Sequence, residues 1–143
     1  MDLVSLQEND FDIDGSVEKV KSSTDRIGGI VTFLGSVRSV SKGMNVKKLD
    51  YKAYRDMAEE EIKRIREEAL ETEGVHEVLI HHRLGELSIG ENTVLIVVGS
   101  EHREEAFNTA KWVIDEVKER VPVWKKEFTE NEDHWVENNN FKR

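Results

Sequence analysis

The chain has 143 residues, enough for one domain with its own hydrophobic core. Hydrophobic residues make up 37% of it and charged residues 36%, and the net charge is −9. This acidic balance argues against a general nucleic-acid binder, which needs cations to replace the counterions of the phosphates. No apolar run approaches the length of a membrane span, and the N-terminus lacks a secretory signal, so we expect a cytoplasmic protein.

The sequence contains no cysteine. This excludes disulfide bonds, thiolate metal sites, iron–sulfur clusters and a cysteine nucleophile or persulfide. If the protein handles sulfur, another molecule must therefore carry the sulfur atom.

The first part of the chain predicts strands on either side of a glycine-flanked loop. Residues 30–34 are β-branched and aromatic, which is typical of a buried strand, and residues 46–54 alternate in polarity like a half-exposed strand. The elements expected here are a short strand over residues 3–6, a brief helix capped by Asp14 or Ser16 that runs to Val20, the two strands just named, and a loop over residues 35–43 between them.

The remainder of the chain predicts two long helices, each with an apolar stripe. Asp56 and Glu59 have the spacing of a capping box, and the helix that they begin is expected to end at Gly74. Ser100 is the expected N-cap of the second helix, which Pro122 ends. The stripes consist of Ala58, Ile62, Ile65 and Ala69, and of Ala106, Ala110, Val113, Ile114 and Val117.

Strands are predicted over residues 75–83, 93–99 and 123–128. The sum is a single α+β domain over residues 1–143, with a mainly antiparallel sheet and two long helices packed on it. Residues 130–143 are mostly polar, with Trp135 and Phe141 among the exceptions, and we expect them to form a tail.

Lys118 is the first candidate for a reactive side chain. On a helix it lies about 40° from Ile114, at the border of the apolar stripe, so its stem can pack on the core while its ammonium reaches a cleft. Lys125 follows beyond Pro122, and in an extended segment Lys126 points to the opposite side. Two ammonium groups that converge on one place indicate a bound anion. Ordinary surface lysines beside a structural tryptophan are the alternative.

His102 and Arg103 fall in the first turn of the second long helix. Backbone N–H groups and the helix dipole favour anions there, and both side chains can donate to phosphate. Solvated surface charges are the alternative explanation. Arg38, in the loop over residues 35–43, can close over the same ligand, although arginines are common in loops.

His81 and His82 suggest a metal site only at first sight. Adjacent residues on a strand face opposite sides, so the two rings cannot easily share one ion. The sequence also has no His-Glu-x-x-His motif, nucleophile elbow, Walker loop or Gly-x-Gly-x-x-Gly fingerprint. We therefore expect neither a metal nor another cofactor.

Several segments taken together resemble the large, catalytic subunit of molybdopterin synthases. They are VTFLGSVR at residues 31–38, HRLGEL at 82–87 with IGE at 89–91, SEHREEAF at 100–107 and KERVPVWKKE at 118–127. Their order and spacing match that family across roughly residues 28–137. The last segment, combined with His-Arg at the start of the preceding helix, is the most specific feature.

The resemblance implies an α/β hammerhead fold and a homodimer of large subunits. A small ubiquitin-like subunit docks at each far end to give a heterotetramer, and its C-terminal thiocarboxylate threads into the large subunit's pocket. Two sulfur transfers to cyclic pyranopterin monophosphate (precursor Z) then form the dithiolene of molybdopterin. A sulfurtransferase that takes its sulfur from a partner agrees with the absence of cysteine.

The resemblance also implies the catalytic residues. Lys118 and Lys125 match the family's essential lysines, with Lys118 at the thiocarboxylate and reacting carbon, and Lys125 holding the tail or the pterin. The family often has a basic residue where this chain has Ser36, which leaves one cation fewer near the phosphate.

The expected substrate-binding residues lie in three of the matched segments. Arg38, His102 and Arg103 match residues that bind the anionic end of the substrate, and the last two are expected to reach across the dimer interface. Lys126 and Glu127 lie in the matched substrate-binding stretch after the second helix.

Two other functions compete with the sulfurtransferase. One is a non-catalytic binding module that captures a phosphorylated metabolite with the same cations. The other is a structural subunit in which the lysines form an interaction surface. Substitution of Lys118 distinguishes the three, because only the enzyme loses turnover while it still folds and assembles.

Overall fold

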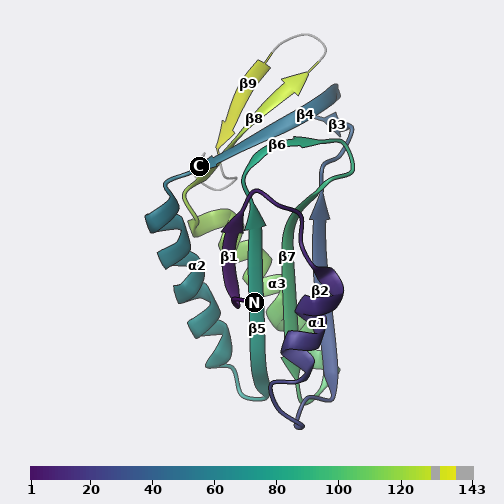
Figure 1. Cartoon of the computed structure of the whole chain (residues 1–143), viewed down its shortest axis with the longest axis vertical. Coiled ribbons are helices and arrows are strands. Elements are labelled where there is room, and N and C mark those ends of the chain that lie inside the picture. Colours follow the sequence, from purple (N-terminus) through teal and green to yellow (C-terminus); the bar gives the residue numbers. More distant parts are fainter. Residues whose placement is uncertain (130–132, 138–143) are drawn as a thin grey trace.

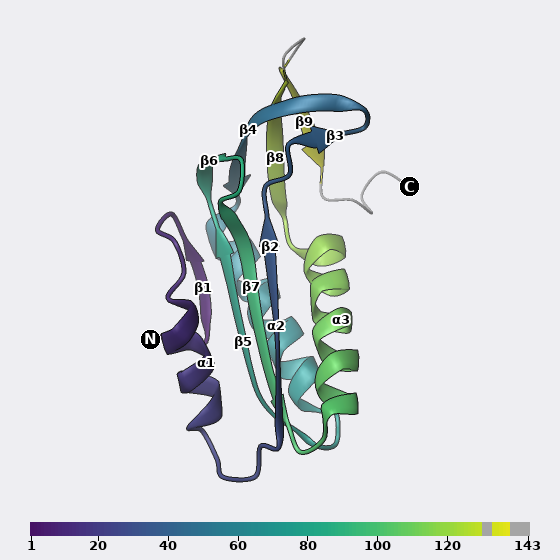
Figure 2. The same cartoon turned by 90° about the vertical axis from the view of Figure 1, so that its right-hand side faces the viewer.

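The computed structural model describes residues 1–129 and 133–137 and contains two β-sheets (Figure 1). The first sheet has four strands in the order β1-β5-β7-β2. The second contains β3, β4, β8 and β9, with β6 paired to β4. The second sheet lies across one end of the first (Figure 1). Helices α2 and α3 cover one face of the first sheet, and α1 covers the other (Figure 2).

The first sheet and its helices make up the larger part of the molecule. Its strands are β1 (Val4–Gln7), β2 (Gly29–Ser36), β5 (Val75–Arg83) and β7 (Asn92–Ser100), and its helices are α1 (Ile13–Lys21), α2 (Arg55–Leu70) and α3 (Arg103–Arg120). The second sheet consists of β3 (Val40–Ser41), β4 (Met44–Ala53), β6 (Gly85–Ser88), β8 (Val123–Thr129) and β9 (Asp133–Glu137). No helix in the described ranges is both long and apolar enough to cross a membrane.

The central strands β5 and β7 are buried on both faces. Ile80 and Ile96 belong to the core under α2 and α3, whereas Leu79 and Leu95 belong to a second core under α1. Successive side chains of a strand point to opposite faces, so a strand between two layers of helices needs apolar residues at every position. This explains the continuous apolar run at residues 94–98.

The predicted α+β fold, with a mainly antiparallel sheet and two long helices, is confirmed. Among the described strands only β1 and β5 pair in parallel. β5 has the predicted bounds. The predicted apolar stripes of α2 and α3 are buried, except that Ile114 is half-buried and Thr109 is buried in addition.

The predicted starts of α1 and α2 are wrong. α1 is capped by Asp12, whose carboxylate accepts a hydrogen bond of 3.0 Å from the backbone N–H of Gly15. α2 begins at Arg55 after Tyr54, so Asp56 lies inside its first turn instead of capping it. Because its last turn closes at Leu70, α2 also ends before Gly74, which forms the turn into β5 with a φ of +89°.

The predicted N-cap of α3 is wrong as well. Ser100 is the last residue of β7, where it pairs with Gly29 of β2, and His102 occupies the N-cap position. Sheet pairing continues to Ser100, so the helix starts only after the chain has turned. The Ser100 hydroxyl instead donates to the His102 carbonyl at 2.5 Å and supports this turn.

Three of the described strands were not predicted from the sequence. Residues 85–88, expected as a connection, form β6 on β4, and the expected loop over residues 35–43 contains β3. β9 lies within the expected tail and pairs with β8. The rest of that tail, at residues 130–132 and 138–143, falls outside the described residues. Each missed strand has at most five residues, too few to show a clear alternation of polarity, and pairing with a neighbour decides its conformation.

Arg120 fastens the C-terminal end of α3 to α2. Its guanidinium lies 2.6 Å from Glu61 and 2.7 Å from Glu68 of α2, and 3.1 Å from Glu116 one turn earlier in α3. These hydrogen bonds raise the pKa of Arg120 above its ordinary value despite partial burial. These ion pairs of Arg120 with Glu61, Glu68 and Glu116, called the Arg120 clamp below, fix the turn of α3 that carries Lys118.

Candidate active site

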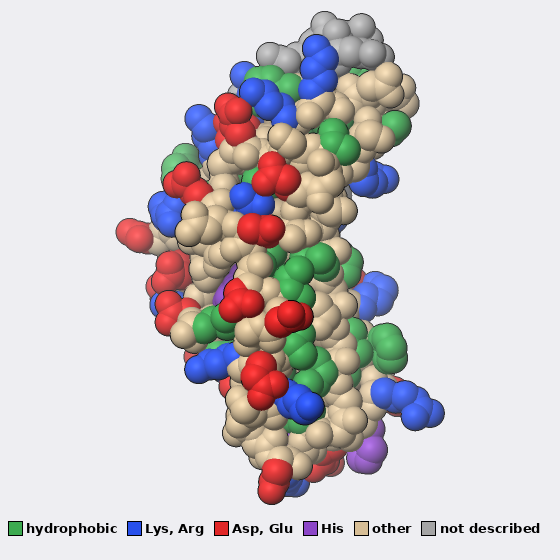
Figure 3. All heavy atoms as spheres, turned by 45° about the vertical axis from the view of Figure 1, so that its right-hand side comes forward, with side chains coloured by type: hydrophobic (Ala, Val, Ile, Leu, Met, Phe, Trp, Pro, Cys, Tyr) green, Lys and Arg blue, Asp and Glu red, His purple; other side chains and the backbone are tan. Residues whose placement is uncertain are grey.

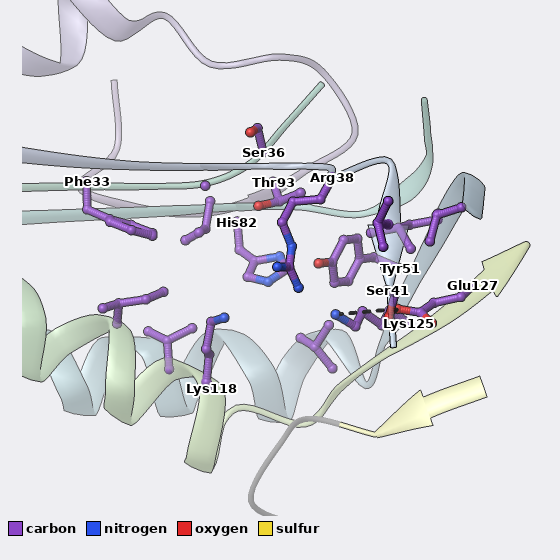
Figure 4. Close-up of a pocket in the computed structure, with 18 of the residues that line it drawn as sticks. Phe33, Ser36, Arg38, Ser41, Tyr51, His82, Thr93, Lys118, Lys125 and Glu127 are labelled. Carbon is purple, nitrogen blue, oxygen red and sulfur yellow. Dashed lines mark hydrogen bonds and ion pairs between the residues drawn. The ribbon is translucent and has the colours of Figure 1, made fainter. Parts of the chain in front are cut away.

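A pocket of about 610 Å³ opens between the end of the first sheet, the second sheet and the last turns of α3. Figure 4 shows its side chains projecting inward from both sheets and from the helix. The residues that line it are Phe33, Gly35, Ser36, Arg38, Val40, Ser41, Lys42, Val46, Leu49, Tyr51, His82, Thr93, Val94, Ile114, Val117, Lys118, Val123, Lys125 and Glu127.

The structure brings four of the predicted site residues together in this pocket, the three cations described next and Glu127. Arg38 comes from the segment after β2, Lys118 from the last turn of α3, and Lys125 from β8, where it pairs with Tyr51 of β4. Lys118 is exposed and extends from the helix toward the space that Arg38 and Lys125 approach from the sheets (Figure 4). The predicted convergence of the two lysines on one cleft is confirmed.

Lys125 experiences the field of the other cations. Burial is the main cause that lowers its pKa, and Lys118, Arg38 and Lys42 lower it further. Glu127 opposes them, with a carboxylate oxygen 4.0 Å from the Lys125 Nζ atom. Positive charges crowded into a partly buried space favour the binding of an anion, which relieves their repulsion.

Glu127 is the buried carboxylate of the pocket. Its side chain is 4% exposed, and one of its oxygens accepts a hydrogen bond of 3.0 Å from the Ser41 hydroxyl. This bond ties β3 to β8 and closes the side of the pocket next to Lys125. Glu127 thus lies within the pocket, as expected from the position of its segment.

Lys126 does not line the pocket. Neighbouring residues of β8 alternate between faces, and the Lys126 ammonium lies 5.1 Å from the centre of the Phe128 ring. This agrees with the prediction that Lys125 and Lys126 point to opposite sides. The substrate-binding role expected for Lys126 stays a prediction.

His102 and Arg103 lie at the opposite end of α3 from Lys118. At 1.5 Å per residue, the 16 positions between His102 and Lys118 correspond to roughly 24 Å. Both residues are exposed, and His102 Nδ1 lies 3.5 Å from a carboxylate oxygen of Glu105. Within one chain, therefore, these two residues do not join Arg38 and the lysines.

The pocket contains functional groups that the sequence analysis did not select. Lys42 stands on the turn between β3 and β4, with φ of +50°, and adds a fourth cation. The sequence offered a signal for it, a lysine next to the turn glycine Gly43. Tyr51 was assigned only to a strand, yet it lines the pocket, where burial and then Glu127 raise its pKa to about 12.

His82 was part of the matched segment at residues 82–87, but the only role considered for its ring was that of a metal ligand. Its ring lines the pocket and packs edge-on against Tyr51, with ring centroids 5.2 Å apart. Nδ1 is 2.7 Å from the carbonyl oxygen of Arg83. His81 faces the other side of the sheet, where its Nε2 lies 2.7 Å from the carbonyl oxygen of Asp2. The two rings point to opposite faces, as predicted.

The face of the molecule drawn in Figure 3 carries no cluster of positive charge outside the pocket. Side chains of both signs are interspersed over the face in Figure 3, with no broad basic area on it. The chain is acidic overall, at −9, while four cations and one carboxylate line the pocket. The site therefore attracts a compact anion locally, which is a different arrangement from a nucleic-acid surface.

Comparisons with known proteins agree with this geometry. A family model described as MoaE protein matches residues 6–120. The molybdopterin synthase catalytic subunit of Pyrococcus abyssi is 51% identical over 128 residues, which cover 90% of this chain and 85% of that protein. The molybdopterin synthase structure from Staphylococcus aureus superposes with a TM-score of 0.87 at 33% identity, covering 95% of this chain and 98% of that one.

A more distant structure shares the fold. It comes from a complex of subunits 1 and 2 of the molybdopterin-converting factor of Helicobacter pylori, with a TM-score of 0.76 at 19% identity over 96% of this chain and 92% of that one. The family model and the closely similar relatives each span most of the sequence. The chain therefore belongs to the MoaE family of molybdopterin synthase catalytic subunits, which are sulfurtransferases of molybdenum cofactor biosynthesis.

Proposed function

We propose that the cation-lined pocket is the place where this chain converts precursor Z to molybdopterin with sulfur from the thiocarboxylate of a small partner subunit. The observation that carries the proposal is the convergence of Arg38, Lys118 and Lys125 on one pocket of about 610 Å³. Both reactants are anions, a thiocarboxylate and a phosphate ester. A site built from donor-only cations suits such a pair.

Lys118 is assigned to the reacting centre. It extends from the end of a helix that the Arg120 clamp fixes, so its ammonium can be held near one point of the pocket. When the thiocarboxylate sulfur attacks the pterin carbon, negative charge develops on the substrate, and a nearby cation stabilises it. The same ammonium can supply a proton to that charge.

Lys125 and Arg38 are assigned to binding. Lys125 lies on β8 beside Glu127, which limits where its ammonium can rest and favours one orientation for the carrier's tail or the pterin. Arg38 has a planar guanidinium that can bind two phosphate oxygens at once. Lys42 is close enough to influence Lys125 and so adds to the positive field around the phosphate.

The sulfur atom comes from the partner, because the chain has no cysteine to carry a persulfide. We propose that the partner is a small ubiquitin-like subunit whose C-terminal tail enters the pocket. The Helicobacter pylori complex of two molybdopterin-converting-factor subunits, which has the same fold in one of its chains, supports this assignment.

We also propose a homodimer of this chain within a heterotetramer. His102 and Arg103 are exposed and far from the pocket of their own chain, although they belong to a matched segment. A second copy would place them at the first copy's pocket. Each active site would then combine residues of two chains.

The test of the catalytic assignment is reconstitution of the reaction. The protein is mixed with thiocarboxylated small subunit and precursor Z, and dithiolene pterin is detected by mass spectrometry. Lys118→Ala is expected to fold and assemble normally but to form almost no product. The matched control is Lys111→Ala, an exposed lysine two turns earlier in α3 that pairs with Asp115 at 2.7 Å.

Three outcomes oppose the proposal. Product formation by Lys118→Ala at the parental rate removes that lysine from the reaction. Binding of precursor Z without turnover in the parent, given a competent partner, favours the binding module. Loss of assembly in Lys118→Ala favours the structural role.

The shared site is tested by mixing two inactive variants, Lys118→Ala and Arg103→Ala. If sites are composite, random exchange of subunits restores one intact site in each mixed dimer, or about a quarter of the wild-type activity. If each chain carries a complete site, the mixture stays inactive.

A further inference from the structure

His82 stands in the pocket as a neutral ring with a fixed tautomer. Its Nδ1 atom lies 2.7 Å from the Arg83 carbonyl oxygen, which can only accept a hydrogen bond. Nδ1 therefore carries the hydrogen, and in a neutral imidazole Nε2 then carries a lone pair. The ring projects into the space between Arg38 and Lys118 (Figure 4).

The surroundings keep this ring neutral and hold it in place. Burial is the main cause that lowers its pKa, to about 4, and Lys118 lowers it further, while the bond to Arg83 acts in the opposite direction. Tyr51 packs edge-on against the ring at an interplanar angle of 84°. The charged neighbours that line the same pocket are Arg38, Lys42, Lys118, Lys125 and Glu127.

Lys118 needs an acceptor to hold its ammonium in place. The structure gives that ammonium no hydrogen bond or ion pair with any described residue, although it lies on a long side chain among other cations. A carboxylate partner would hold it but would also cancel its charge. A neutral acceptor can orient the ammonium and leave the charge available to the substrate.

We propose that His82 is a positioning residue for sulfur transfer, whose Nε2 lone pair accepts a hydrogen bond from the Lys118 ammonium when the substrates fill the pocket and directs that ammonium toward the reacting carbon. The inference rests on the proposed function, because it assigns Lys118 to the reacting centre. It adds a residue that acts through Lys118 and need not contact the substrate itself.

Three substitutions distinguish the role of Nε2 as a hydrogen-bond acceptor from the packing and Nδ1 hydrogen bond of the ring. His82→Phe keeps the contact with Tyr51 and removes both nitrogens. His82→Asn keeps a group at the position of Nδ1 for the Arg83 carbonyl and lacks one at Nε2. His82→Gln places an amide oxygen near the position of Nε2 and can still accept from Lys118.

The expected result is a loss of rate with binding preserved. At saturating carrier and precursor Z, sulfur transfer by His82→Phe and His82→Asn should fall roughly tenfold to a hundredfold, the range for one lost hydrogen bond to a charged group. His82→Gln should recover much of the rate. Affinity for the small subunit, measured by calorimetry, should change little in all three variants.

His81→Gln is the matched control, since His81 is an equally buried neighbour that bonds to Asp2 on the opposite face. It is expected to lower the melting temperature and to leave the rate unchanged. If His81→Gln slows transfer as much as His82→Phe does, general loosening of β5 explains the effect and the inference fails. Equal rates for His82→Gln and His82→Phe also overturn it.

A spectroscopic measurement tests the contact directly. In ring-labelled protein, nitrogen NMR should find His82 at neutral pH with hydrogen on Nδ1 and none on Nε2. In Lys118→Met the pKa of His82 should rise, because the cation that lowers it is gone. An unchanged His82 pKa in that variant would show that the ammonium lies too far from the ring to bond to it, and would overturn the inference.

These outcomes are separable from those of the proposed function. If Lys118→Ala retains full activity, the catalytic assignment fails whatever His82 does. If Lys118→Ala is inactive while His82→Phe is fully active, the catalytic assignment stands and only the positioning role is lost.

Discussion

Arg120→Met tests whether the clamp between α2 and α3 stabilises the fold and positions Lys118. The substitution keeps a long apolar stem and removes the guanidinium that holds Glu61, Glu68 and Glu116. The three carboxylates then lose their shared cation, and among the described residues Glu61 keeps only its pair with Arg64. Lys118, two residues earlier in the same turn, loses the fixed end of its helix.

The magnitude follows from the geometry of the clamp. An exposed ion pair contributes about 0.2–1 kcal/mol, but the Arg120 side chain is only 25% exposed and has three partners within 3.1 Å. We therefore expect a loss of about 2 kcal/mol in the free energy of unfolding. For a domain of this length that corresponds to a melting temperature lower by about 6 °C.

The loss in the free energy of unfolding caused by Arg120→Met should depend on pH. Hydrogen bonding to Arg120 holds the pKa of Glu68 below its ordinary value of 4.5. A carboxylate with a lowered pKa in the folded state stabilises the protein above its unfolded-state pKa and loses that contribution as the pH falls through the folded-state pKa. The difference between wild type and Arg120→Met should be full at pH 7 and shrink below about pH 4.5.

The assay is urea unfolding at several pH values, with Arg64→Met as the matched control. Arg64 makes one exposed pair with Glu61, at 3.0 Å, and its removal should change stability by less than about 0.5 kcal/mol. Equal effects of the two substitutions at pH 7 would refute the reasoning. So would a penalty for Arg120→Met that grows as the pH falls.

Two further predictions concern the pocket and the core. Because the pKa of Lys125 is lowered, Lys125 should react with an amine reagent at a lower pH than an ordinary lysine. Glu127 raises that pKa, so Glu127→Gln should move the reaction to a still lower pH. Peptide mass spectrometry after pulsed labelling measures this, and a labelling midpoint at or above 10.5 contradicts it. Gly99→Ala should destabilise the fold by about 1–3 kcal/mol, because the new Cβ lies 2.8 Å from side-chain atoms of Val20 and Ile27. Unchanged denaturant unfolding of that variant would contradict the packing argument.

The apolar periodicity of the sequence was sufficient to predict the layers of the fold. The stripes of α2 and α3 and the apolar run of β7 follow from which side chains must be buried, and burial acts over whole elements. Helix ends were predicted less well, because several residues compete to cap each one. Asp12 was overlooked in favour of Asp14, and Ser100 remained in β7 because its pairing with β2 outweighed its preference for a cap.

The site shows the same division between local and long-range information. The alternation of a strand predicted that Lys125 and Lys126 point apart, and the helical angle placed Lys118 at the border of the buried stripe. Neither pattern could predict that His82 and Lys42 line the same pocket as the two lysines. They do so because β5, the β3–β4 turn and the end of α3 lie next to one another in the fold. Contacts of this kind depend on how the strands and helices are connected in space, and the spacing of residues along the sequence does not predict them.

The arrangement of the pocket explains how four cations can face one another in an acidic protein. Arg38, Lys42, Lys118 and Lys125 come from four separate segments, and each segment is held by backbone or side-chain contacts outside the charged groups. The Arg120 clamp holds α3, and pairing with β4 holds both β8 and β3, while the Val37 N–H bond to the Glu91 carbonyl holds the segment of Arg38. Their repulsion is therefore opposed by the fold and not by neutralising partners at the site, where Glu127 is one carboxylate among four cations. An arriving anion meets charges that are already in position, and little reorganisation is needed when charge develops during the reaction. This argument requires the cations to stay in place without ligand, so loosening a remote support such as Arg120 should lower the rate more than it lowers substrate affinity.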